Sequence, residues 1–169
     1  MNKQFSDDMG TTGYKVTMIV TGGGMTAATE STKCGGASKW FQGAYLPYDG
    51  EMTKSLMGVI GSPKMVSPET AGALVQNHWE NGKPMSMCIA STSKLTYEGE
   101  REGRSHDAYI ALSRCNARSE YGHFLYHLEI EPGDRLFQEN VVAGTICNLL
   151  LHHTSSDEEM QFPGLELLN

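Results

Sequence analysis

A strand-like segment that runs into three consecutive glycines constrains this chain more than any other feature. Residues 14–20 are rich in β-branched side chains, and glycines occupy positions 22–24. Glycine interrupts a strand and allows a tight turn. Residues 25–32 are small and compatible with a helix, which the glycines at 35 and 36 would end. The segment therefore predicts a strand, a glycine-rich turn and a short helix.

Segments of strand and helix character alternate through most of the remaining chain. Strands are expected over the ranges 41–48, 85–90, 107–112 and 121–130, and helices over 51–59, 68–79 and 136–152. Ser67 is placed as an N-cap and Pro68 as the first helical residue, which is a favourable helix start. Such alternation is typical of helices that cover both faces of a sheet. The pattern predicts a layered α/β protein.

Composition indicates one globular domain that binds neither nucleic acid nor membrane. The 169 residues are 39% hydrophobic and 20% charged, which suits a single core. The net charge of −7 leaves no basic field to gather phosphates. No apolar run approaches the roughly 18 residues of a membrane span, and the first residues lack the apolar segment of a secretory signal. A cytoplasmic protein is expected.

Cysteines and histidines form no pattern typical of a metal site. Cys34, Cys88, Cys115 and Cys147 are widely separated, and none belongs to a C-x-x-C pair. The six histidines form no H-E-x-x-H motif. We interpret the cysteines as reduced, mostly buried thiols and expect neither a metal ion nor a cofactor.

Loops at the predicted strand ends contain the candidate functional residues. In sheets of this kind, ligands bind beyond the carboxyl ends of the strands. The loops concerned are 21–25, 47–51, 91–93 and 133–135. Residues 98–106 are dense in charge and glycine and are expected to be exposed. The charged insert 98–104 within them is either a lid or a simple surface excursion.

Several short motifs, taken in order, resemble the C-terminal domain of CinA proteins, whose usual motifs are E-S-x-T-G-G, P-G-A-S, F-x-G-G and Y-S-N-E. The positions that correspond are Thr21, Thr32, Gly36-Ala37-Ser38, Phe41, Gly43 and Tyr48. Later matches are Leu56-Met57-Gly58-Val59, Val66-Ser67-Pro68-Glu69, Tyr109-Ile110-Ala111-Leu112 and Gly133-Asp134-Arg135. The resemblance implies a three-layer α/β/α sandwich with a mixed central sheet.

The resemblance also divides the chain. It covers roughly residues 15–152. We expect an N-terminal extension over 1–14, a CinA C-terminal-like domain over 15–154 and an acidic tail over 155–169. Family members commonly assemble with copies of themselves, so the resemblance implies a homo-oligomer whose other partner is a small-molecule nucleotide.

The sequence departs from the family in its catalytic loop. Val20 stands where the family has glutamate, and Thr21 stands where it has serine. Thr53 falls on the family lysine, with Lys54 adjacent, and residues 91–96 replace the T-G-x-A-G-P loop. The family's long N-terminal helix is also expected to be missing or shortened.

The activity implied by the resemblance is that of a nicotinamide-nucleotide amidase, which releases ammonia from the carboxamide of nicotinamide mononucleotide without a cofactor. The expected catalytic residues are Thr21, Ser38, Tyr48 and Lys54, and the expected ligand-binding residues are Gly22, Gly23, Gly24, Thr92 and Arg135. In this scheme Thr21 is the nucleophile, Lys54 a base or phosphate anchor, and Arg135 a planar fork for phosphate or carboxylate.

The chemistry of amide hydrolysis gives these residue types a reason. A hydroxyl nucleophile needs a base and donors for the oxyanion. Backbone N–H groups at the start of a helix, here those of the glycine turn, are suitable donors. The additional methyl group of threonine restricts its rotation, which lowers activity relative to serine. The alternative function is therefore an inactive relative that binds or sequesters a nucleotide or regulates a protein partner.

Each candidate also has a purely structural interpretation. Thr21 could cap the following helix, and Arg135 could pair with Asp134 or Glu139 in a surface turn. Tyr48 could cover the edge of the core.

A dinucleotide-binding fingerprint is a competing interpretation of the glycine turn. Gly22, Gly24 and Ala27 follow a strand with the appropriate spacing, and Asp49 would be the ribose acid. The unit is cramped, and this interpretation leaves the downstream motif matches unexplained, so we favour the CinA-like one.

Overall fold

The computed structural model describes residues 3–33, 35–59, 61–79, 83–154 and 163–168. The helices are α1 (Lys3–Thr12), α2 (Met25–Lys33), α3 (Gly50–Met57), α4 (Pro68–His78) and α5 (Arg135–His152), with a short 3-10 turn, η1 (Ala37–Lys39). The strands are β1 (Lys15–Thr21), β2 (Phe41–Tyr45), β3 (Ser86–Lys94), β4 (Asp107–Cys115), β5 (Tyr121–Glu129) and β6 (Leu165–Leu167).

The six strands form one mixed sheet in the order β2-β1-β3-β4-β5-β6. β1 is parallel to both β2 and β3, and its last residue, Thr21, lies opposite Thr92. The later neighbours, β3 with β4, β4 with β5 and β5 with β6, are antiparallel. The carboxyl ends of β1, β2 and β3 therefore meet at one edge of the molecule.

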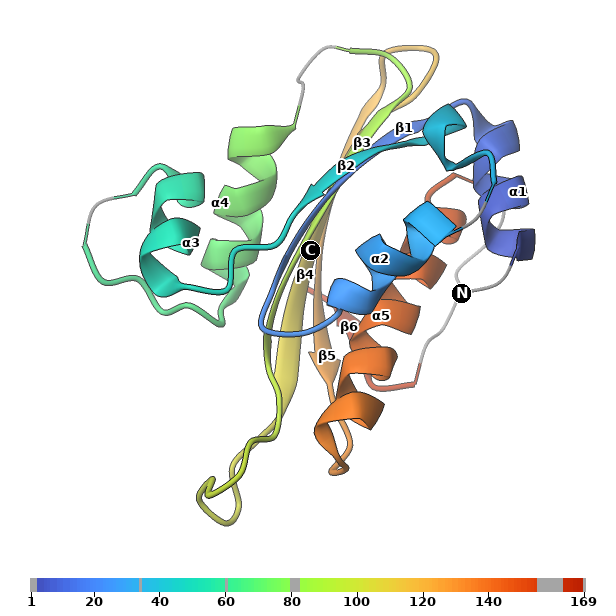
Figure 1. Cartoon of the computed structure of the whole chain (residues 1–169). Coiled ribbons are helices and arrows are strands. Elements are labelled where there is room, and N and C mark those ends of the chain that lie inside the picture. The colour runs from blue at the N-terminus through green and yellow to red at the C-terminus, as the bar shows by residue number, and fades with distance from the viewer. Residues whose placement is uncertain (1–2, 34, 60, 80–82, 155–162, 169) are drawn as a thin grey trace.

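Helices cover both faces of this sheet. Figure 1 shows α1, α2 and α5 on one side and α3 and α4 on the other. The predicted three-layer α/β/α sandwich with a mixed central sheet is confirmed.

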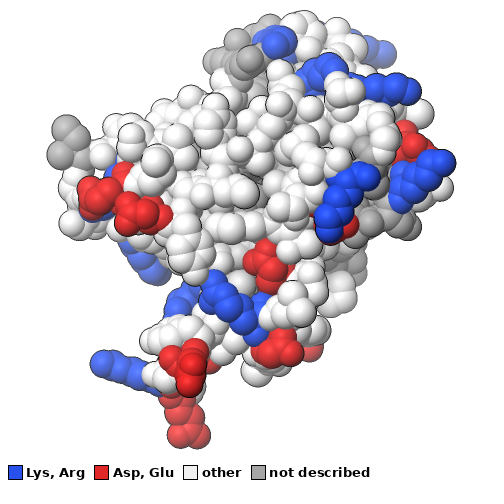
Figure 2. Space-filling model, in the orientation of Figure 1, with Lys and Arg blue, Asp and Glu red and all other residues white. Residues whose placement is uncertain are grey.

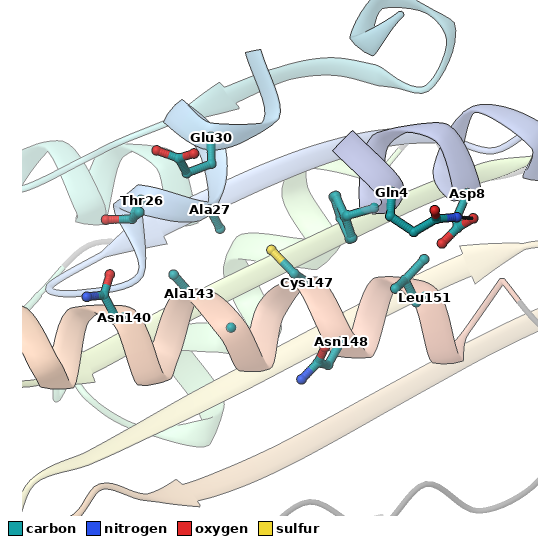
Figure 3. A pocket seen from close by; sticks show the side chains of 12 residues that line it. Gln4, Asp8, Thr26, Ala27, Glu30, Asn140, Ala143, Cys147, Asn148 and Leu151 are labelled. Carbon is teal, nitrogen blue, oxygen red and sulfur yellow. Dashed lines mark hydrogen bonds between the residues drawn. The ribbon is translucent and has the colours of Figure 1, made fainter. Parts of the chain in front are cut away.

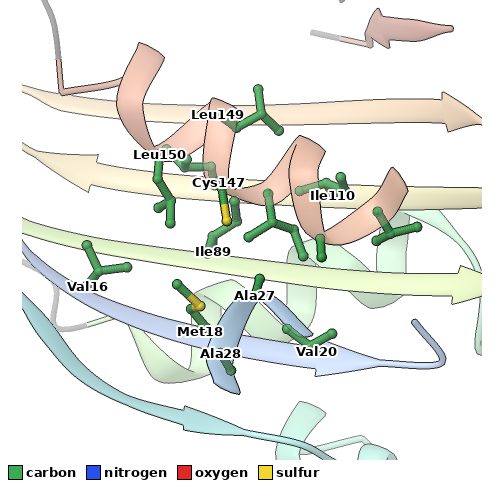
Figure 4. Close-up of a cluster of buried hydrophobic side chains, with 14 of the residues drawn as sticks. Val16, Met18, Val20, Ala27, Ala28, Ile89, Ile110, Cys147, Leu149 and Leu150 are labelled. Carbon is green, nitrogen blue, oxygen red and sulfur yellow. The ribbon is translucent and has the colours of Figure 1, made fainter. Parts of the chain in front are cut away.

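Two hydrophobic clusters, one on each face, hold the layers together. The larger lies under α2 and α5 and includes Val16, Met18 and Val20 of β1 together with Leu149 and Leu150 of α5 (Figure 4). The smaller lies under α4 and is formed by Ile19, Met57, Ala71, Leu74, Val75, Cys88, Ala90 and Ala111. Because alternate residues of a strand point to opposite faces, β1 and β3 are buried on both sides.

The N-terminal segment contributes to the core. α1 buries Phe5 and Met9, and the Phe5 ring meets Trp40 edge-on at 5.4 Å. The Trp40 indole donates to Ser6 Oγ at 3.2 Å. This ten-residue helix lies within the segment that was expected to be an extension, so residues 3–12 pack as part of the folded unit.

Three element boundaries differ from expectation. β2 ends at Tyr45 rather than 48, because Asp49 accepts hydrogen bonds from the amides of Glu51 and Met52 and so caps α3. β3 continues to Lys94, and its polar residues 91–93, expected in a loop, are buried between β1 and β4. β6 pairs with β5 inside the expected tail.

Charge on the visible face is mixed. Figure 2 shows Lys and Arg together with Asp and Glu over much of this face, with a broad uncharged area in its upper part. Among the described helices, none has the length and apolar character that a membrane crossing requires.

Candidate functional site

Arg135 joins three segments at the carboxyl edge of the parallel strands. Its guanidinium donates to Thr96 O at 2.9 Å, to Gly22 O at 3.3 Å and to Tyr48 Oη at 3.1 Å. Three of the predicted ligand and pocket residues, far apart in sequence, are thus hydrogen-bonded to one another or to a common partner.

The start of α5 fixes the position of this guanidinium. Asp134 is the N-cap, since its carboxylate accepts from the Phe137 amide at 2.7 Å, and Arg135 is the first helical residue. Asp134 is therefore occupied as a cap. The surface ion pair considered for Arg135 is replaced, within the described residues, by the contacts to Thr96, Gly22 and Tyr48.

A cavity of about 450 Å³ opens beside these contacts. It is lined by Gly22, Met25, Tyr48, Arg135, Leu136 and Glu139. The Tyr48 side chain is 70% exposed and Leu136 is 69% exposed, so an aromatic ring and an aliphatic side chain stand open to solvent next to a guanidinium. We call this the Arg135 cavity.

Glu139 binds the start of α2. Its carboxylate accepts from Gly24 N at 2.7 Å, from Thr26 N at 2.8 Å and from Thr26 Oγ1 at 3.1 Å. Helix N-termini carry unpaired N–H groups and attract anions, and here a side chain of the same molecule is that anion. The cap that Thr21 was considered to provide is supplied by Glu139.

The three glycines of the turn pack against protein atoms. A Cβ on Gly22 would lie 2.2 Å from Ser93 O, and one on Gly23 would lie 2.4 Å from Leu95 Cδ1. A Cβ on Gly24 would lie 2.7 Å from Val142 Cγ1. The Ser93 backbone and a φ of +87° therefore require glycine at position 22, and α5 crowds position 24, where φ is +91°, whereas the neighbour of Gly23 is the end of the Leu95 side chain.

The two threonines expected at the site, Thr21 and Thr92, differ in the hydrogen bonding of their hydroxyl groups. Thr21, at the end of β1, is half-buried, and its hydroxyl has no hydrogen-bond partner within the described residues. Thr92 is buried in β3 and its hydroxyl donates to Met65 O. Thr92 therefore holds the segment before α4 and does not line the Arg135 cavity.

Lys54 lies on α3 and pairs within its own helix. Its ammonium lies 2.6 Å from Glu51 Oε1, a carboxylate whose side chain is 81% exposed. Asp49, the candidate ribose acid, caps the same helix with its carboxylate. In the fold as it stands, both residues have structural partners on α3.

Ser38 lies at the opposite end of the sheet, contrary to expectation. It belongs to η1, before β2, and its carbonyl accepts from Lys15 Nζ at 3.2 Å. Lys15 begins β1 and Thr21 ends it, so about 20 Å of strand separates the two ends. A residue that precedes a parallel strand cannot reach the carboxyl edge.

A second polar cluster lies further along the same edge. The Asp107 carboxylate forms an ion pair with Lys94, whose Nζ lies 2.8 Å from Oδ2. The other carboxylate oxygen, Oδ1, lies 3.5 Å from His127 Nε2. Burial would raise the pKa of Asp107, but the hydrogen bond and charge of Lys94 outweigh it and lower that pKa. Lys94 also donates to Ser105 at 2.9 Å, which fastens the base of the 98–106 loop to β3.

The cysteine thiols in the described part of the chain are buried away from solvent. Cys88, Cys115 and Cys147 are buried and form no disulfide with one another, and burial raises the pKa of Cys88 and Cys147 to about 12. Cys34 lies outside the described residues. Within the described part, no three His, Cys, Asp or Glu side chains converge as a metal site would require.

Sequence reasoning missed the role of Glu139. One signal was present: Glu139 lies on the predicted helix 136–152, four residues after Arg135, and this spacing places two helical residues on one face. The target of that face, the turn 115 residues earlier in the chain, has no local signature.

Comparison with known proteins identifies the fold. In sequence, no family model and no curated protein matches the chain. In structure, it is similar to a competence or damage-inducible protein from Enterobacter asburiae, at a TM-score of 0.65 and 15% identity, over 90% of this chain and 98% of that one. It is also similar to the competence/damage inducible protein CihA from Agrobacterium tumefaciens, at a TM-score of 0.68 and 15% identity, over 90% and 95%.

A competence-damaged protein (CinA) superfamily protein from Escherichia coli gives a TM-score of 0.62 at 14% identity, over 90% of this chain and 86% of that one. The chain therefore has the CinA-type fold that its motifs predicted.

Proposed function

We propose that this chain binds a nucleotide-sized anion in the Arg135 cavity and does not hydrolyse it. The observation that carries the proposal is the pairing of Arg135 with Tyr48 at the cavity mouth while Glu139 occupies the amides of Gly24 and Thr26. The Arg135 guanidinium can recognise an anion. The amides of Gly24 and Thr26 are unavailable for an oxyanion because Glu139 accepts their hydrogen bonds.

Recognition would rest on the guanidinium and the phenol ring. Arginine has five N–H donors in a plane, and the three bonds recorded within the described residues leave two for a phosphate or carboxylate oxygen. The exposed Tyr48 ring offers a face on which a planar heterocycle can stack. Nicotinamide mononucleotide, the ligand implied by the motif resemblance, has both a phosphate and a planar heterocycle.

The geometry of the cavity disfavours hydrolysis. Amide cleavage needs a base beside the nucleophile and two or more oxyanion donors. Lys54 is bound to Glu51, and Glu139 holds the amides at the start of α2. Both would have to be released before Thr21 could act.

One observation favours the amidase as a second candidate. Thr21 lies half-buried at the carboxyl end of β1, and its hydroxyl makes no hydrogen bond within the described residues. A hydroxyl that is not bound to another group of the protein is available to a base and to a substrate.

The test combines calorimetric titration with nicotinamide mononucleotide and an assay of ammonia release. We expect binding by the wild type, loss of binding in Arg135→Ala, and no ammonia above a protein-free blank. Ammonia release that disappears in Thr21→Ala would overturn the non-catalytic proposal and support the amidase. If the protein neither binds nicotinamide mononucleotide nor releases ammonia from it, the proposal of a nucleotide ligand is wrong. A protein partner would then be the class of ligand to test.

A further inference from the structure

The charged loop after β3 is joined to the Arg135 cavity through Thr96. Thr96 O accepts from Arg135 Nη1 at 2.9 Å, so this carbonyl is one of the three oxygens that hold the guanidinium. Thr96 follows β3 and precedes the charged insert 98–104. The contacts that fix Thr96 therefore also fix the direction in which Arg135 presents its remaining donors.

α5 holds the backbone of Thr96 from one side. The Thr96 amide donates to Gln138 Oε1 at 2.6 Å, and Gln138 is fully buried. Gln138 Nε2 donates in turn to Glu131 O at 3.2 Å. Asn140, two residues further along α5, instead lines the separate groove between α1, α2 and α5 (Figure 3). The Thr96 hydroxyl has a different partner.

Glu100 holds Thr96 from the other side. Thr96 Oγ1 donates to Glu100 Oε1 at 2.7 Å, and the Tyr97 amide donates to Glu100 Oε2 at 3.4 Å. The carboxylate therefore turns back on the residues that start its own loop. The hydrogen bond of Thr96, followed by that of His106, lowers the pKa of Glu100, so Glu100 is ionised at neutral pH.

Groups from the far end of the loop fasten Glu100 in place. His106 Nε2 lies 3.1 Å from both carboxylate oxygens, and the His106 side chain is only 9% exposed. Arg104 Nη1 lies 3.5 Å from Glu100 Oε2, and the Arg104 guanidinium lies 4.6 Å from the centre of the Tyr97 ring. His106 O accepts from Ile130 N at 3.0 Å, which joins this end of the loop to the end of β5.

We infer that Glu100 is a positioning residue for the Arg135 cavity, and that the charged loop is part of the site. Through the Thr96 hydroxyl, Glu100 keeps the Thr96 carbonyl where Arg135 can donate to it. A guanidinium held in this way presents its remaining donors in a fixed direction, so a bound anion has less to order. The effect on nucleotide binding rests on the proposed function, whereas the effect on Arg135 itself does not.

The first test needs no ligand. Hydrogen bonds from a guanidinium slow the rotation of its terminal amino groups, which nitrogen NMR spectroscopy of arginine side chains measures, and Arg135→Lys identifies the signal. We expect Arg135 to rotate at least ~3-fold faster in Glu100→Ala and in Thr96→Val, because each removes the bond that holds Thr96. Glu100→Gln keeps an acceptor for the Thr96 hydroxyl and should restore the wild-type rotation.

The second test is calorimetric titration with nicotinamide mononucleotide. Glu100→Ala and Thr96→Val should each weaken binding by roughly 3- to 10-fold. The double variant should lose no more than either single variant, because both act through one hydrogen bond. Glu98→Ala removes an exposed carboxylate from the same loop and should match the wild type in both tests.

Three results would each overturn the positioning role: unchanged rotation of Arg135 in Glu100→Ala, additive losses in the double variant, or equal losses in Glu100→Ala and Glu98→Ala. Circular dichroism checks that each variant folds, and Thr96→Val decides both tests if Glu100→Ala does not. A wild type that fails to bind the nucleotide overturns the proposed function alone, because the rotation of Arg135 still decides the role of Glu100.

Discussion

The amide of Gly24 donates a 2.7 Å hydrogen bond to the carboxylate of Glu139, a residue 115 positions further along the chain. This bond ties the first strand-to-helix turn to the last long helix. It also places a negative charge at the start of α2, where the peptide dipoles favour one. The turn that most constrained the sequence analysis is therefore held by a residue from the far end of the chain.

We expect Glu139→Ala to lower the free energy of unfolding by about 1–3 kcal/mol, because the buried amides of α2 lose a charged acceptor. Glu139→Gln keeps one acceptor oxygen and should lose less. Urea unfolding measures both. Glu51→Ala, which removes an exposed carboxylate, is the control and should change stability by less than about 0.5 kcal/mol. A similar value for Glu139→Ala would mean that the cap contributes nothing.

Gly24 and Gly36 form a matched pair for separating packing from backbone strain. Their φ angles are +91° and +90°, but a Cβ on Gly24 meets Val142 whereas one on Gly36 meets nothing within 4 Å. We expect about 1 kcal/mol of destabilisation for Gly36→Ala from the left-handed backbone alone, and about 2–4 kcal/mol for Gly24→Ala after overpacking is added. Thermal unfolding of the two variants decides the point. Equal losses would contradict the packing argument.

His153 should make stability depend on pH. Burial, followed by the charges of Arg114 and His152, lowers its pKa from the ordinary 6.5 to about 3, and its Nε2 lies 2.7 Å from Tyr126 Oη. The folded protein then binds fewer protons than the unfolded chain between these two values. Stability should therefore fall as pH drops below about 6.5, by up to ~1.4 kcal/mol per pH unit.

The measurement is the free energy of unfolding at pH 7, 6 and 5 for the wild type and for His153→Gln. The glutamine offers Tyr126 a polar partner but does not titrate. Its pH slope should be shallower, and identical slopes would exclude His153 as the source.

Local chemistry made the elements predictable, and topology explains where the site assignment failed. The glycine turn, the Ser67 cap and the α5 helix follow from residues near one another in sequence. Ser38 was placed at the site by its motif alone. Because β2 is parallel to β1, a residue before β2 lies at the amino edge of the sheet, so the topology excludes Ser38 from the carboxyl edge.

Other features had no local signal. The polar run 91–93 resembled a loop because its hydroxyls suggested exposure, yet pairing with β1 and β4 buries it. Arg135 and Tyr48 were both selected, but their contact depends on where α5 begins relative to the end of β2. Such relationships are set by packing between elements.

Tyr48→Phe should weaken nicotinamide mononucleotide binding by roughly 3- to 10-fold, because it removes one of the acceptors that orient Arg135 while keeping the ring. Ser38→Ala, at the other end of β1, should bind like the wild type. Titration calorimetry compares the two. Equal effects would show that the ligand does not bind at the Arg135 cavity.

We propose that copies of the chain associate through the β2 edge. β2 is an outer strand. Exposed apolar residues lie near this edge: Tyr45 ends β2, Leu46 follows it and Met52 lies on α3. Unpaired strand edges readily pair with a second chain. Light scattering should find a dimer or larger species that Leu46→Lys shifts towards the monomer. A monomeric wild type at about 100 µM, a concentration well above the typical micromolar Kd, would contradict the proposal.

The mixed sheet also dictates an order of events during synthesis. β3, β4 and β5 follow one another and pair through short connections, so this meander can form as soon as it emerges. β1 must wait for β3 to appear about seventy residues later before its second edge is paired, and local contacts form faster than distant ones. A nascent chain that has reached β5 has still not released α5 from the ribosome, so its glycine turn has no Glu139 to bind.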